Sequence, residues 1–206
     1  MVSRSPLVPA AHTKAVGILL AGGYSRRFGT DKLLALLPDG TPIAVAAARV
    51  LRDGMTLALG EGVQIVAVMR PEQNELANLL YGEGITVLAS DAVRRGMGAS
   101  LAAAVTATAD AQGWLVALAD MPFVKPKTVA AVARALTAEN KIAAPAINGR
   151  RGHPVGFAAS HGAALATLDG DEGARRLLAE NEVTLIACDD AGILRDVDTP
   201  GDLRQR

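Results

Sequence analysis

The residues best suited to chemistry gather in one glycine-rich, cationic segment, residues 20–32, which reads LAGGYSRRFGTDK. It follows an apolar run at 15–21, and open α/β sheets bind ligands at the carboxyl ends of such strands. Gly22 and Gly23 allow backbone N–H groups to approach an anion closely. Hydrogen-bond donors and positive charges for a triphosphate come from Ser25, Arg26, Arg27 and Lys32. The segment therefore predicts a phosphate-binding loop, and a merely solvated loop between strand and helix is the alternative.

The glycine spacing of this loop excludes two common nucleotide-binding motifs. Five residues separate Gly23 from Gly29, so the loop is not the G-x-G-x-x-G fingerprint of dinucleotide-binding proteins. Gly29 is followed by Thr-Asp-Lys rather than by Lys-Ser/Thr, so the loop is not a Walker A motif either.

Carboxylates follow two other expected strands. Asp120 comes directly after the apolar run 115–119 and should face the same crevice as the glycine loop. Carboxylate oxygens suit Mg²⁺, which is commonly held by one or two carboxylates and substrate phosphates. We therefore predict Asp120 as a metal ligand, with a turn-capping role as the alternative. Asp196 and Asp198 alternate along an expected strand, so at most one joins the site; we favour Asp198, which could instead cap the last helix.

Two further segments carry glycines and cations. Residues 94–101, RRGMGASL, resemble a helix start where an anion is favoured, and Gly96, Gly98 and Ser100 leave room for a flat base. An ordinary glycine-rich helix start is the alternative. Residues 149–157, GRRGHPVGF, could hold a second anionic substrate through Arg151 and His153, although a lone histidine is more often structural. The acidic residues in 168–176 would interact favourably with the dipole at a helix N-terminus, so they call for no functional explanation.

The elements that must position these residues are short apolar runs that alternate with helical patterns. The runs are continuous rather than alternating, as expected for strands buried on both faces of a parallel or mostly parallel sheet in a three-layer α/β domain. We expect a mobile tail over 1–13 and one domain over 14–206. Strands are expected at 15–21, 63–69, 85–89, 114–119, 142–147, 183–187 and 192–198. Helices are expected to begin at Pro42 with Thr41 as the N-cap, and to span 72–81, 96–109, 126–136, 160–168 and 172–180.

Composition excludes several classes of protein. The 206 residues contain 21 Lys+Arg and 21 Asp+Glu, so the formal net charge is zero, and only 3% are aromatic. This argues against a basic or ring-lined nucleic-acid surface. The single cysteine, Cys188, excludes a disulfide framework. No apolar stretch is long enough for a membrane span and no signal peptide is evident, so we expect no membrane association and a cytoplasmic location.

Six ordered segments across residues 15–204 resemble those of molybdenum cofactor cytidylyltransferases, within the wider group of MobA-like NTP transferases. The resemblance implies a Rossmann-like nucleotidyltransferase fold. It also implies transfer of a nucleoside monophosphate from an NTP to the phosphate of molybdopterin, with Mg²⁺ as cofactor, release of pyrophosphate and a client molybdoenzyme as a further partner. The six segments read LAGGYSRRFGTDK, RRGMGASL, LADMPFV, RGHPVGF, LDGDEGARRLL and DVDTPGDL.

The resemblance also implies roles for individual residues. Leu20, Ala21, Gly22 and Gly23 would contact base and phosphates, and the segment 96–100 would lie near base and ribose. Catalytic roles fall to three residues: Arg27 and Lys32 would hold the triphosphate, and Asp120 would bind the metal. Asp198 would be the second metal ligand.

The motifs disagree on the base. LAGG at 20–23 is typical of guanylyltransferases, whereas RGMGAS at 95–100, GHPVGF at 152–157 and GDEGAR at 170–175 are typical of cytidylyltransferases. We favour CTP, with GTP as the alternative. A guanylyl- or sugar-phosphate nucleotidyltransferase, a non-catalytic cofactor-binding accessory protein and a dinucleotide-dependent oxidoreductase remain as other interpretations.

Overall fold

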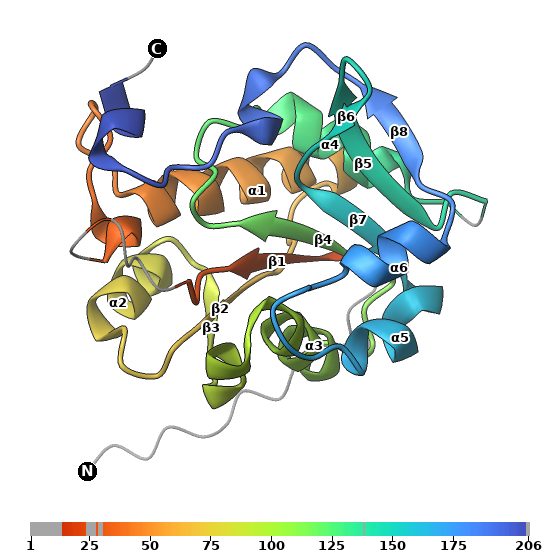
Figure 1. The fold of residues 1–206 in the computed structure, drawn as a ribbon, viewed down its shortest axis with the longest axis horizontal. Coiled ribbons are helices and arrows are strands. Elements are labelled where there is room, and N and C mark those ends of the chain that lie inside the picture. Colours follow the sequence, from red (N-terminus) through yellow and green to blue (C-terminus); the bar gives the residue numbers. More distant parts are fainter. Residues whose placement is uncertain (1–13, 24–27, 29–30, 138, 205–206) are drawn as a thin grey trace.

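An eight-stranded sheet with helices on both faces forms the centre of the molecule (Figure 1). The computed structural model describes residues 14–23, 28, 31–137 and 139–204. The tail expected over 1–13 lies outside these residues. The α/β class with a mostly parallel, mixed sheet is confirmed.

The strands run in the order β3-β2-β1-β4-β7-β5-β6, and β8 pairs with β5. Neighbours from β3 to β4 are parallel, β7 is antiparallel to both β4 and β5, and β8 is parallel to β5. The bounds are β1 Val16–Leu20, β2 Ile65–Met69, β3 Thr86–Ala89, β4 Gly113–Leu118, β5 Ile142–Ile147, β6 Arg150–Arg151, β7 Val155–Ala158 and β8 Thr184–Ala187.

Helices cover the sheet in two layers. Helices α1 and α4 pack on each other over one face, and α3 packs with α5 over the other (Figure 1). No helix in the described part of the chain is long and apolar enough to cross a bilayer. The α-helices are α1 Ile43–Leu59, α2 Asn74–Gly82, α3 Met97–Ala107, α4 Pro126–Ala135, α5 Gly162–Ala166 and α6 Arg175–Glu180. Short 3₁₀ helices lie at Lys32–Leu34, Asp91–Arg95, Ala159–His161, Ala191–Leu194 and Pro200–Arg204.

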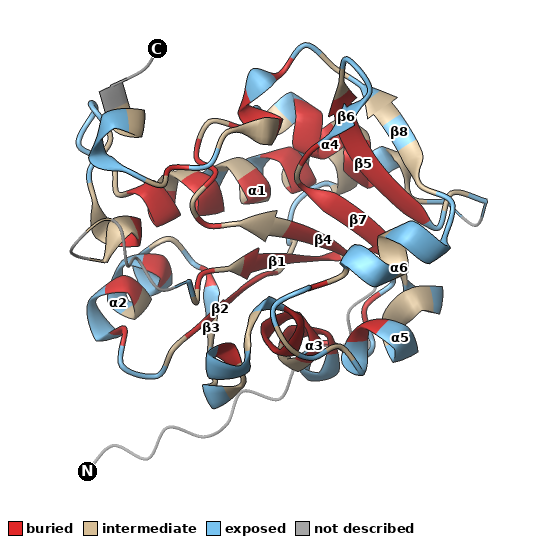
Figure 2. Ribbon diagram, in the orientation of Figure 1, coloured by how far each residue is buried: buried red, intermediate tan, exposed pale blue. Residues whose placement is uncertain are grey.

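Burial on both faces of the sheet explains the continuous apolar runs. In β1, Leu19 belongs to the core beneath α1 and α4, whereas Val16 and Ile18 belong to the core beneath α3 and α5. Trp114 of β4 and Phe157 of β7 belong to the second core. Strands β5 and β7 are coloured as buried over most of their length (Figure 2). Every side chain of a central strand therefore meets a helix layer.

Three local expectations were wrong. The segment 149–157 was not expected to contain a strand, yet β7 lies between β4 and β5. The glycines and the proline of this segment hide the hydrophobic pattern of a strand, and the two partner strands supply its burial. The strand expected at 192–198 is replaced by the 3₁₀ helix Ala191–Leu194, because the Asp190 carboxylate accepts a hydrogen bond from the Gly192 N–H. Helix α1 begins at Ile43 with Pro42 as its cap residue, while the Thr41 N–H donates to Asp39.

Candidate functional site

A cavity of about 310 Å³ opens at the carboxyl ends of β1 and β4. Leu20 is in register with Leu118, so the chain that leaves each strand reaches the same edge of the sheet. The volume lies at the lower end of the range of small-molecule pockets. The residues that line it come from the loops after both strands and from the start of α3: Leu20, Gly22, Gly23, Lys32, Leu33, Val93, Arg94, Gly96, Met97, Ser100, Leu118, Asp120 and Asp171.

Lys32 joins the two predicted metal-binding carboxylates at one end of this cavity. Its Nζ donates to Asp120 Oδ2 at 2.8 Å and to Asp198 Oδ1 at 3.0 Å. The lysine side chain is only 11% exposed, whereas that of Asp198 is 47% exposed. Burial alone would lower the pKa of Lys32, but the hydrogen bonds and charges of Asp120 and Asp198 outweigh it and raise the pKa above 10.5. The ammonium is therefore charged at neutral pH.

The position of Asp198 depends on a buried carboxylate that the sequence did not single out. Asp190 accepts hydrogen bonds from the Lys125 N–H at 2.8 Å and from the Thr128 hydroxyl at 2.6 Å, as well as from the Gly192 N–H. These bonds fix the turn from which the chain returns to Asp120, whose carbonyl accepts from the Val197 N–H at 2.8 Å. The one sequence signal is the aspartate two residues before a glycine, which is typical of an Asx turn.

The segment 196–198, in which the chain returns to Asp120, places the two candidate aspartates near the C-terminus differently. Val197 is fully buried, and it lies between an exposed Asp196 and a partly exposed Asp198 that contacts Lys32. Only Asp198 therefore reaches the group around Lys32, although the segment is not the strand on which that expectation was based. Its metal-binding role stays a prediction.

The glycines at the start of α3 are required by packing. A Cβ atom at Gly96 would collide with the Gly170 backbone and the Asp171 carboxylate, and one at Gly98 would collide with the Asp169 carbonyl. The Gly98 N–H donates to the Gly170 carbonyl at 2.7 Å. The acidic turn 169–171 thus has a structural role beyond the helix dipole, since it packs against the start of α3 and its Asp171 lines the cavity. Contact of these glycines, and of Ser100, with a base stays a prediction.

The glycine loop contributes Gly22 and Gly23 to the cavity. A Cβ at Gly22 would collide with the Val93 side chain, whereas one at Gly23 would meet no heavy atom within 4 Å. Ala21 is buried below them, and its N–H donates to Val68 of β2. The predicted phosphate-binding residues Ser25, Arg26 and Arg27 lie outside the described residues.

The two predicted acceptor-binding residues do not line this cavity. Arg151 is exposed on β6. His153 lines a smaller pocket of about 10 Å³, and its Nδ1 is buried without a hydrogen-bond partner in the described part of the chain. Burial lowers the pKa of His153, although the Val116 backbone and the charge of Asp120 oppose this. The structure therefore places a partly buried His153 outside the lining of the main cavity, and its contact with an acceptor stays a prediction.

The carboxylate pair fits a hard divalent cation. Within the described residues, no cluster of three or more His, Cys, Asp or Glu side chains could hold a metal by itself. Asp120 and Asp198 nonetheless converge on one cationic group at the edge of an open cavity. Two carboxylates with the remaining positions left to phosphate and water are what Mg²⁺ commonly uses.

Comparison with known proteins agrees with this fold. The family described as MobA-like NTP transferase domain matches residues 17–185. No curated protein matches the chain. Among solved structures, Rv0371c from Mycobacterium tuberculosis H37Rv is 28% identical with a TM-score of 0.75, over 93% of this chain and 97% of that one.

Two further solved structures are similar over most of their length. Rv0371c in complex with manganese, from the same organism, is 26% identical with a TM-score of 0.73, over 93% of this chain and 97% of that one. A nucleotidyl transferase from Methanothermobacter thermautotroptrophicus (Mth528) is 21% identical with a TM-score of 0.76, over 92% and 94%, and it supports the fold alone.

Proposed function

Because the chain belongs to the family of MobA-like NTP transferases, we propose that it transfers a nucleoside monophosphate from an NTP to the terminal phosphate of molybdopterin. The observation that carries the proposal is the group Lys32–Asp120–Asp198 beside a cavity of about 310 Å³. CTP is the favoured donor, on the motifs at 95–100, 152–157 and 170–175, and GTP is the alternative. A molybdoenzyme would be the client of the product.

Mg²⁺ is the proposed cofactor, and Asp120 and Asp198 are the residues that would hold it. The bound ion would neutralise charge on the phosphates that meet at the reacting phosphorus. The manganese complex of the 26% identical protein supports a divalent cation at a site of this fold. Each carboxylate has two oxygens, so a cation would either share the pair with Lys32 or displace the ammonium from one of them.

The proposed reaction is a single in-line displacement. An oxygen of the acceptor phosphate attacks the α-phosphorus of the NTP, the bond from that phosphorus to the β-phosphate oxygen breaks, and pyrophosphate leaves. The chain's own contribution is positioning and charge neutralisation, as is usual in phosphoryl transfer. Gly22 and Gly23 would hold the phosphates, and Lys32, with Arg27, would stabilise the leaving pyrophosphate.

The test is incubation with Mg²⁺, molybdopterin and each of CTP, GTP, ATP and UTP, with the dinucleotide product identified by mass. We expect a cytosine dinucleotide and an equal amount of pyrophosphate. A guanine dinucleotide would assign the guanylyl alternative. Product only in a parallel incubation with a sugar phosphate in place of molybdopterin would assign a sugar-phosphate nucleotidyltransferase, and tight binding of molybdopterin without pyrophosphate release would assign an accessory protein. The last two results would each refute the proposed reaction.

A further inference from the structure

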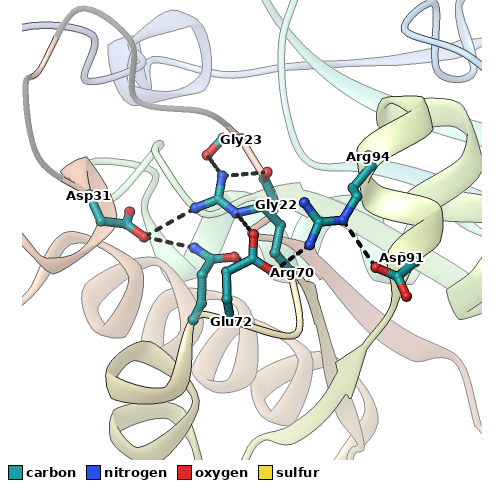
Figure 3. Close-up of polar contacts among 8 residues, drawn as sticks. Gly22, Gly23, Asp31, Arg70, Glu72, Asp91 and Arg94 are labelled. Atoms are coloured by element: carbon teal, nitrogen blue, oxygen red, sulfur yellow. Dashed lines mark hydrogen bonds and ion pairs between the residues drawn. The ribbon is translucent and has the colours of Figure 1, made fainter.

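Arg70, directly after β2, donates hydrogen bonds to the backbone of the glycine loop (Figure 3). One guanidinium nitrogen donates to the Gly23 carbonyl at 3.1 Å and to the Gly22 carbonyl at 3.4 Å. The other terminal nitrogen lies 3.6 Å from Asp31 Oδ2. The Arg70 side chain is only 11% exposed, and the residue is not among those that line the cavity.

The far end of the same loop is attached to the turn after β2 as well. Gln73, which is buried, donates from Nε2 to Asp31 Oδ2 at 2.8 Å, and its Oε1 accepts from the Arg70 N–H at 2.9 Å. Asp31 in turn caps the 3₁₀ helix that begins with Lys32. One turn therefore holds both Gly23, where the loop leaves β1, and Asp31, where it reaches Lys32.

The carbonyl contacts determine how the loop presents its N–H groups. In a trans peptide the C=O and the N–H point in opposite directions, so a Gly22 carbonyl turned toward Arg70 directs the Gly23 N–H away from it. Gly23 lines the cavity and has open space beside its Cα. Close approach of a phosphate requires an N–H group that points toward it and a residue without a side chain, such as glycine.

The charge of Arg70 is balanced within the protein. Its Nε lies 3.5 Å from Glu72 Oε1, and Asp31 contacts its other side. Glu72 also accepts from Arg94 at 3.0 Å (Figure 3), and Arg94 lines the cavity. Two carboxylates beside one guanidinium leave little net charge for a ligand, so the planar donor geometry, rather than the charge, distinguishes this arginine.

We propose that Arg70 is a positioning residue for nucleotide binding, which fixes the Gly22–Gly23 backbone in its phosphate-binding orientation before the nucleotide arrives. The inference rests on the proposed function, because it names the residue that prepares the loop of that same site. Lysine cannot replace the arginine here, since a single ammonium cannot reach both carbonyls and both carboxylates in one plane.

The experiment compares R70M and R70K with the wild type and with a matched control, R52M. Arg52 also donates to a backbone carbonyl, that of Glu83 at 2.9 Å, and pairs with acids, and it does not line the cavity. The dissociation constants of CTP and GTP with Mg²⁺ are measured by calorimetry, KM and kcat are measured by pyrophosphate release, and thermal unfolding monitors the fold.

We expect R70M and R70K to raise Kd and KM for the nucleotide by about tenfold to a hundredfold, the range that losing hydrogen bonds from a charged donor gives. The kcat at saturating nucleotide should change by less than about threefold, because bound phosphate restores the loop and the reacting groups are untouched. R52M should lower the unfolding temperature and leave Kd within about twofold of the wild type.

Wild-type affinity in R70K would overturn the inference, because charge alone would then suffice. An equal loss of affinity in R52M would also overturn it, since general destabilisation would explain both. If R70M does not fold, R70K alone decides. A wild type that binds no nucleotide would refute the proposed function and this inference with it, whereas a binding wild type with unaffected Arg70 variants would refute only the inference.

Discussion

Replacement of Lys32 by methionine tests the charged centre directly. The variant removes the ammonium and keeps most of the side-chain volume, so Asp120 and Asp198 lose the cation that they share. Their hydrogen-bonded oxygens can lie no further apart than the sum of the two Lys32 distances, 5.8 Å. At that separation, two carboxylates repel by about 0.7 to 2.9 kcal/mol for effective dielectric constants of 80 to 20.

Three effects of this variant are expected. We expect K32M to lower the free energy of unfolding by about 1–3 kcal/mol at neutral pH, with the partial exposure of Asp198 keeping the loss toward the lower end. Without nucleotide, however, Mg²⁺ or Mn²⁺ should stabilise K32M more than the wild type, because no ammonium competes for the carboxylates. Nucleotidyl transfer should nevertheless fall by at least about a hundredfold, since the leaving pyrophosphate loses a cation.

Denaturant unfolding with and without each metal measures the first two effects, and pyrophosphate release measures the third. K127M is the matched control, because Lys127 pairs with Asp189 at 3.3 Å on an exposed surface. It should leave metal stabilisation and activity unchanged. Weaker metal stabilisation in K32M than in the wild type would refute the reasoning, since the carboxylates would then not form a common cation site.

Three further variants test other parts of the structure. D120N should reduce turnover by at least about a hundredfold in a pyrophosphate assay while its unfolding temperature stays near that of the wild type; activity within tenfold of the wild type would remove Asp120 from the mechanism. D190A should lower the free energy of unfolding by about 2–4 kcal/mol, because the Lys125 and Gly192 N–H groups lose their acceptor; a loss below about 1 kcal/mol in urea unfolding would contradict that role. Burial lowers the pKa of His153 in the folded protein below 6.5, so as pH falls the histidine is protonated in the unfolded chain first. The free energy of unfolding therefore decreases as pH falls below 6.5. H153Q should therefore flatten the decline in unfolding free energy below pH 6.5, and a slope equal to that of the wild type would show that His153 is not its source.

Local sequence pattern is enough to predict the layers and the edge of the sheet that carries the site. Runs such as 15–21 and 114–119 have no polar side, and such strands are stable only with helices on both faces. Parallel strands bring their carboxyl ends to one edge, so the sequence pattern places Gly23 and Asp120 at the same edge of the sheet. These conclusions depend only on the local hydrophobic pattern and on the chirality of the chain, and both are available from short stretches of sequence.

Which side chains meet in the site depends on how distant segments pack together. Lys32 pairs with carboxylates 88 and 166 residues away, and Arg70 reaches carbonyls 47 and 48 residues away. Strand β7 exists because β4 and β5 offer it hydrogen bonds, and the 3₁₀ turn at 191–194 exists because Asp190 is buried against α4. Periodicity reports only the few residues around each position, whereas hydrogen bonds between distant segments depend on how the whole chain packs.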